Sequence, residues 1–151
     1  MGTRLLSAAL LTAAVVPGLV LAASVSMSPV ISTKLLGKSE VPKGSPTGSG
    51  IAVLHLNAKT GKVCWTFEKV KGIDKPLYAH IHKAPAGKAG NVVVPLGSGG
   101  AYKAKGCTTA KTKLVAAIEE HPNSYYVNIH TKKYPAGAIR GQLVAGMVSG
   151  A

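Results

Sequence analysis

Two short segments with alternating polar and apolar residues constrain the fold of this chain most strongly. They are residues 78–82, Tyr-Ala-His-Ile-His, and residues 125–131, Tyr-Tyr-Val-Asn-Ile-His-Thr. Because successive side chains of a β-strand point to opposite faces, the alternation predicts two strands, each with one apolar face toward a core. The polar faces outside that core then carry three histidines, His80, His82 and His130.

The rest of the chain is divided into short extended stretches by Gly, Pro and Asn. Further strands are expected at residues 30–41, 51–56, 63–70, 91–96 and 138–148, with a loop at 97–106. One helix is expected at residues 109–121, because apolar residues recur there at helical spacing and Pro122 ends the pattern. This organisation predicts an all-β fold, an antiparallel Greek-key β-sandwich with one short helix.

The beginning of the chain has the features of a secretory signal peptide, predicted at residues 1–22. Arg4 precedes an apolar run at residues 5–21, which ends in the small-residue pattern of a signal-peptidase site. We expect a disordered tail at 23–31, one domain at 32–148, no transmembrane segment in the mature chain, and a secreted or periplasmic location. An uncleaved membrane anchor is the alternative, which the short run and its Pro17-Gly18 pair disfavour.

The chain has two cysteines, Cys64 and Cys107. An even number of cysteines in an exported protein indicates a disulfide bond, because export places the chain in an oxidising environment. The alternative, two free thiols, requires a reducing compartment and thus a wrong interpretation of the signal.

The formal net charge of the 151-residue chain is +13. Such an excess favours binding of anionic polymers of the cell envelope, or of an acidic protein partner. Nucleic acid is not an expected partner, because the basic residues are scattered and no recognisable nucleic-acid-binding module is present.

Four motifs occur in one order along the chain. They are Glu40-Val41-Pro42, Ala79-His80-Ile81-His82, residues 125–131, and Gly137-Ala138-Ile139-Arg140-Gly141-Gln142-Leu143. Together they resemble the chordin-type (CHRD) domain family, in its bacterial single-domain exported form, over about residues 32–146. The resemblance implies an extracytoplasmic β-domain that usually has no assigned enzymatic activity. It does not imply the growth-factor binding of chordin itself.

The three histidines form the first candidate site, a surface cluster for copper or zinc. Two His at positions i and i+2 of a strand direct both rings to one side, and imidazole suits both metals. His55 is a candidate fourth ligand, and Tyr78, Tyr126 and Asn128 are expected to surround the ligands. The pattern is similar to the His-x-His strand of Cu/Zn superoxide dismutase, also a β-sandwich. The alternative is that the histidines belong to a structural layer of hydrogen-bonded polar groups.

Glu40 and Arg140 form the second candidate site. Acidic residues are scarce in this chain, so a bidentate ion pair that joins the first and last strands is the favoured interpretation. In the alternative, Arg140 guides an anion toward the histidines.

The sequence therefore predicts a binding protein and no catalytic residues. Two alternatives remain: a copper enzyme similar to superoxide dismutase, and an interaction module that binds envelope polyanions or a protein.

Overall fold

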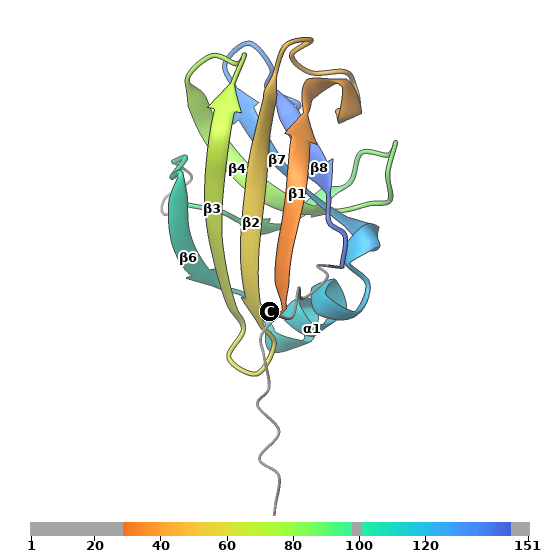
Figure 1. The fold of residues 1–151 in the computed structure, drawn as a ribbon. Coiled ribbons are helices and arrows are strands. Elements are labelled where there is room, and N and C mark those ends of the chain that lie inside the picture. Colours follow the sequence, from red (N-terminus) through yellow and green to blue (C-terminus); the bar gives the residue numbers. More distant parts are fainter. Residues whose placement is uncertain (1–28, 98–100, 146–151) are drawn as a thin grey trace, which may run out of the picture.

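The computed structural model describes residues 29–97 and 101–145 as an antiparallel β-sandwich with one short helix (Figure 1). The predicted signal peptide and most of the predicted tail lie outside the described residues. The strands are β1 (Val30–Leu36), β2 (Ser49–Asn57), β3 (Lys62–Lys71), β4 (Pro76–Lys83), β5 (Asn91–Pro95), β6 (Lys105–Thr109), β7 (Tyr125–Thr131) and β8 (Ile139–Gln142). The helices are η1 (Gly37–Ser39, 3-10), α1 (Thr112–Glu120) and η2 (Pro122–Ser124, 3-10).

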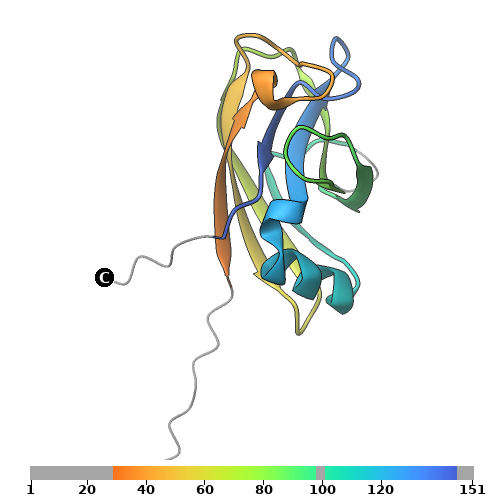
Figure 2. The same cartoon turned by 90° about the vertical axis from the view of Figure 1, so that its right-hand side faces the viewer.

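The eight strands form one sheet, in the order β5-β4-β7-β8-β1-β2-β3-β6, that folds over on itself. The described register joins β1 to β8 at a single position, Leu36 opposite Arg140, so the sheet is free to bend there. Figures 1 and 2 show the resulting two layers, with β1, β2, β3 and β6 in one and β4, β7 and β8 in the other. The chain crosses between the layers from β3 to β4, returns from β5 to β6, and crosses again from β6 through α1 to β7, which confirms the predicted sandwich.

The core lies between the layers and is built by the alternation that the sequence shows. In β2 and β3 the buried side chains are Ala52, Leu54, Leu56, Val63, Trp65 and Phe67, as expected. Ala79, Ile81, Val127 and Ile129 fill the core from the opposite layer. Helix α1 closes one end of the sandwich with Val115 and Ile118, which are both fully buried. No helix in the described parts of the chain has the length and hydropathy needed to cross a membrane.

The boundaries of several elements differ from those expected. Strand β1 begins at Val30, so the last residues of the predicted tail belong to the sheet, because Ile31 is an apolar core residue. Helix α1 begins only at Thr112, since Lys105–Thr109 forms strand β6 where a loop was expected. The last strand is shorter than predicted and ends at Gln142.

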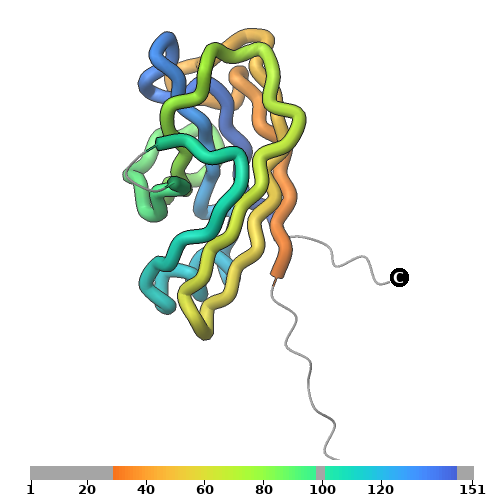
Figure 3. The backbone as a smooth tube through the Cα atoms, turned by 90° about the vertical axis from the view of Figure 1, so that its left-hand side faces the viewer, coloured from red at the N-terminus to blue at the C-terminus, as the bar shows by residue number. Residues whose placement is uncertain are grey.

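Strand β6 is held at one edge of the sheet by its pairing with β3, and Figure 3 shows the two segments side by side. Cys64 and Cys107 are direct partners in this pairing and form a disulfide bond, which confirms the predicted link. The bond joins an edge strand to its neighbour, so it fixes a segment with few apolar residues of its own.

The polar face of β4 and β7 is not a free surface, contrary to the prediction of a surface cluster. Every residue of β7 is buried, including those that point away from the core. The reason is that two loops, residues 84–90 and 132–137, fold back over this face through hydrogen bonds. His82 and Gln142 contact carbonyls of the first loop, and His130 contacts Pro135 of the second.

Candidate metal centre

The pairing of β4 with β7 brings together histidines from two distant segments of the chain. In the register Tyr78 lies opposite His130, and His80 lies opposite Asn128. These side chains share the outward face, because the residues between them enter the core. The alternation seen in the sequence therefore produces one cluster of three imidazoles, His80, His82 and His130.

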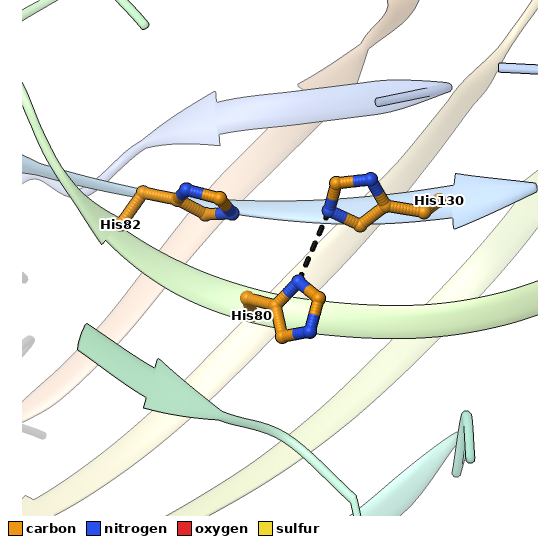
Figure 4. Close-up of side chains that lie close together, drawn as sticks. All are labelled: His80, His82 and His130. Atoms are coloured by element: carbon orange, nitrogen blue, oxygen red, sulfur yellow. Dashed lines mark hydrogen bonds between the residues drawn. The ribbon is translucent and has the colours of Figure 1, made fainter. Parts of the chain in front are cut away.

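The three histidines are close enough to be ligands of one ion. Each offers a ring nitrogen that lies within 4.8 Å of the nitrogens offered by the other two. His80 Nδ1 and His130 Nε2 are only 3.1 Å apart, and a dashed line in Figure 4 marks the hydrogen bond between the two rings. Two nitrogens that bind one zinc ion at about 2.0–2.1 Å with tetrahedral angles are about 3.3 Å apart. The His80–His130 pair thus has a spacing close to that of two ligands of one ion.

Two of the rings are oriented by backbone carbonyls of the covering loops. His82 Nδ1 donates to Gly90 O at 2.9 Å, and His130 Nδ1 donates to Pro135 O at 2.9 Å. A carbonyl only accepts, so both Nδ1 atoms carry hydrogen and both Nε2 atoms present a lone pair when the rings are neutral. A hydrogen bond from the distal ring nitrogen to a carbonyl is the usual support of a metal-binding histidine.

The His82 Nε2 lone pair has no hydrogen-bond partner although the atom is buried. His130 Nε2, in contrast, accepts a hydrogen bond, which must come from His80 Nδ1. A proton therefore lies between His80 and His130, at a position where a metal cation would contact both rings. Buried polar atoms in proteins are nearly always satisfied, so the orphaned nitrogen of His82 indicates a site for a further group.

All three imidazoles are held neutral. Burial lowers the pKa of His80, the neighbouring His130 and His82 act in the same direction, and together they bring it to about 4. Burial also lowers the pKa of His82 and that of His130, which outweighs the opposing hydrogen bonds to the loop carbonyls. Since a metal binds the deprotonated ring, this environment removes the competition of protons at neutral pH.

Two tyrosines lie against the histidine rings, as the sequence led us to expect. The Tyr126 ring stacks on His82, with centroids 4.7 Å apart and planes 7° from parallel. Its hydroxyl accepts a hydrogen bond from Gly90 N at 3.3 Å, so it also supports the loop that orients His82. Tyr78 stacks more loosely on His80, at 6.3 Å, and is exposed. The His82 ring is therefore held more rigidly than the His80 ring.

Glu40 and Arg140 are both buried, at 3% and 2% exposure, but they do not form the bidentate pair that was predicted. Arg140 donates Nη1 to Lys88 O at 2.8 Å, and its guanidinium lies over the Tyr126 ring at 4.3 Å. Glu40 Oε1 is left without a hydrogen-bond partner. The guanidinium of Arg140 contacts the Lys88 carbonyl and the Tyr126 ring instead of Glu40. Arg140 therefore acts on Glu40 only through its charge, which lowers the pKa of the carboxyl group. Its burial also makes Arg140 a poor guide for anions from solvent.

His55 does not join the cluster. It is exposed on β2, where it lies opposite Cys64, and two strands separate β2 from β7 in the sheet. The prediction of His55 as a fourth ligand is therefore wrong for this arrangement. The prediction was based on the alternation in β2, which correctly indicates that His55 points away from the core. The outer face of β2, however, belongs to the layer opposite the histidine cluster.

The backbone groups that orient the rings were not expected from the sequence. Gly90 and Pro135 act through their carbonyl oxygens, which every residue has, so residue identity gives no signal. Gly90 carries one partial clue, because a Cβ there would collide with the backbone carbonyl of Lys83. A glycine is thus required where the loop returns to the sheet.

Comparison with known proteins agrees with the motifs. The profile of the CHRD domain family matches residues 31–143, from the second residue of β1 to the residue after β8. Searches among curated proteins and among solved structures gave no match. The matched range contains all three histidines and both cysteines, so the resemblance inferred from the motifs is confirmed. The chain belongs to the CHRD domain family.

Proposed function

We propose that this protein is an exported binding protein that holds one copper or zinc ion at His80, His82 and His130. The observation that carries this proposal is the orientation of the rings. Loop carbonyls occupy Nδ1 of His82 and of His130, and this leaves their Nε2 lone pairs for a shared ligand. A layer of purely structural histidines has no need to leave one of them, His82 Nε2, buried and unpaired.

The donor set favours copper and zinc over harder cations. Neutral imidazole nitrogen is a good ligand for both metals, whereas calcium and magnesium prefer oxygen. The hydrogen-bonded carbonyls and the stacked Tyr126 hold the ligands in the way that the outer shell of a metal site does. The basic overall charge repels cations in general, copper and zinc included, so binding relies on these ligands rather than on bulk attraction.

A binding role is favoured over a copper enzyme of the dismutase type. An enzyme of that kind needs a path by which an anion reaches the metal. Arg140, the candidate guide, is buried, bonded to Lys88 O and stacked on Tyr126. Storage, delivery or buffering of a metal outside the cytoplasm is the role we propose, and the disulfide bond is consistent with that location.

The proposal is tested by calorimetric titration of the oxidised protein with copper and with zinc. The wild-type protein is expected to bind one equivalent of at least one metal with submicromolar affinity, and the His80→Ala/His82→Ala variant is expected to lose this binding. His55→Ala is the matched control, because it removes an exposed histidine from the other layer and should leave binding unchanged. Wild-type protein that takes up neither metal would falsify the proposal.

A further inference from the structure

In the described parts of the chain, four buried side-chain polar atoms have no hydrogen-bond partner. They are Glu40 Oε1, His82 Nε2, and both side-chain atoms of Asn128, Nδ2 and Oδ1. Asn128 is completely buried. A fully buried amide that makes no hydrogen bond is unfavourable for stability, so a reason for its presence has to be sought in function.

Asn128 occupies the centre of the polar face. On β7 it lies between Tyr126 and His130, and its cross-strand partners are His80 on β4 and Arg140 on β8. The strand pairing also places His82 on the same face, two residues beyond His80 on β4, while Arg140, the β8 partner of Asn128, acts on Glu40 through its charge. Asn128 therefore lies between the proposed ligand His80 on β4 and Arg140 on β8.

The hydrogen-bonding capacity of these groups decides how the amide is oriented. In its ionised form, which the charge of Arg140 favours, Glu40 only accepts, so it attracts the Nδ2 hydrogens of Asn128. The Oδ1 atom then points to the other side, toward His82 Nε2. That nitrogen also presents a lone pair, because the His82 hydrogen is on Nδ1 and is donated to Gly90 O. Two lone pairs that face each other in a buried site repel unless a cation lies between them.

We propose that Asn128 Oδ1 is a fourth donor to the copper or zinc ion, and that Glu40 orients the amide for this role. The inference rests on the proposed function, and it gives the site three nitrogen donors and one oxygen donor. It also accounts for all four orphaned atoms, because Glu40 and Nδ2 satisfy each other while Oδ1 and His82 Nε2 contact the ion. Oxygen from an amide is an ordinary metal ligand.

The test compares the wild-type protein with Asn128→Leu, which has similar size and no donor atom. We expect copper affinity to fall about 10- to 100-fold, while the metal-free variant unfolds at the same or a higher temperature, because the unsatisfied amide is gone. A residue of a structural polar layer would instead lower the unfolding temperature. In water enriched in oxygen-17, the copper electron paramagnetic resonance signal should broaden in Asn128→Leu, where water takes the open position, and not in the wild type.

A second pair of variants tests the role of Glu40 without removing a ligand. Glu40→Gln keeps an oxygen that accepts from Asn128 Nδ2 and should retain the wild-type affinity, whereas Glu40→Leu should weaken binding. Unchanged affinity in Asn128→Leu, or oxygen-17 broadening already in the wild type, overturns the fourth donor and leaves the three-histidine site intact. Absence of binding in the wild type removes both proposals, so the two failures are distinguishable.

Discussion

His80 Nδ1 lies 3.1 Å from His130 Nε2, although 50 positions separate the two residues in the chain. The antiparallel pairing of β4 with β7 creates this contact, and the loop carbonyl bonded to the far side of His130 decides which ring donates. A hydrogen bond between two neutral imidazoles in a buried site is easily replaced by a metal ion that contacts both. This relationship is the basis of the site proposed above.

The Gly90 carbonyl is expected to control metal affinity without being a ligand. In Gly90→Ala the new Cβ collides with the carbonyl of Lys83, so the loop shifts and His82 Nδ1 loses its acceptor. We expect metal affinity to fall about 10- to 100-fold, as for other losses of a supporting hydrogen bond.

Gly87→Ala, in the same loop, is the matched control, because a Cβ there meets nothing within 4 Å. It should cost about 1 kcal/mol of stability through its positive φ but leave affinity unchanged. Equal affinities in both variants would show that the loop does not orient His82.

The stability of the metal-free protein is expected to fall as the pH is lowered from 6.5 toward 4. Unfolded histidine takes up a proton near pH 6.5, but His80 in the folded protein remains neutral until about pH 4. Protons therefore favour the unfolded state in this interval, and His82 and His130 act in the same direction. Denaturant titrations in the presence of a chelator measure the effect. His80→Asn should show a shallower loss of stability on acidification, and an unchanged slope would contradict the assignment.

Glu40 is expected to act on stability in the opposite direction. Burial raises its pKa from 4.5 to about 7, against the weaker opposing effect of Arg140. The folded state thus binds the proton more tightly than the unfolded state, and the stabilisation is present below pH 4.5 and lost as the pH rises through 7. Glu40→Gln removes this loss, so the variant should gain stability relative to the wild type between pH 4.5 and 8. A constant difference across this range would mean that Glu40 does not titrate as described.

The histidine cluster could be predicted from the sequence because it depends on strand alternation alone. His80 and His82 share a face at spacing two, and Asn128 and His130 do likewise in the partner strand. The covering loops could not be predicted, because contacts such as Arg140 to Lys88 O depend on how distant segments dock. The same limit explains why the cluster was expected at the surface, why His55 was included, and why Arg140 was assigned to Glu40.

The strands could be predicted where apolar and polar side chains alternate along the sequence. The apolar residues of β2 and β3 alternate, and they lie in the core as expected. Strand β6 was missed because Lys105–Thr109 has little apolar alternation. Its position comes from pairing with β3 and from the bond between Cys64 and Cys107, which are features of the tertiary structure.

The disulfide bond is expected to contribute about 4 kcal/mol to stability, since it closes a loop with a sequence separation of 43 residues. The double variant Cys64→Ala/Cys107→Ala should show this loss in denaturant titrations. Its metal affinity should stay unchanged, because β3 and β6 lie in the layer opposite the histidines. Addition of a reductant should destabilise the wild type to a similar extent and leave the variant unaffected. A loss below about 1 kcal/mol would contradict the proposed role of the bond.

The most direct test of the metal centre is nitrogen-15 magnetic resonance of the histidine rings during a zinc titration. One equivalent of zinc is expected to shift the signals of His82 Nε2, His130 Nε2 and His80 Nδ1 to those of ligand nitrogens. His55 and His121 should keep their signals, because neither belongs to the cluster. If the shifts fall on His55 or His121, or if the His80, His82 and His130 signals do not change, the three-histidine site is contradicted.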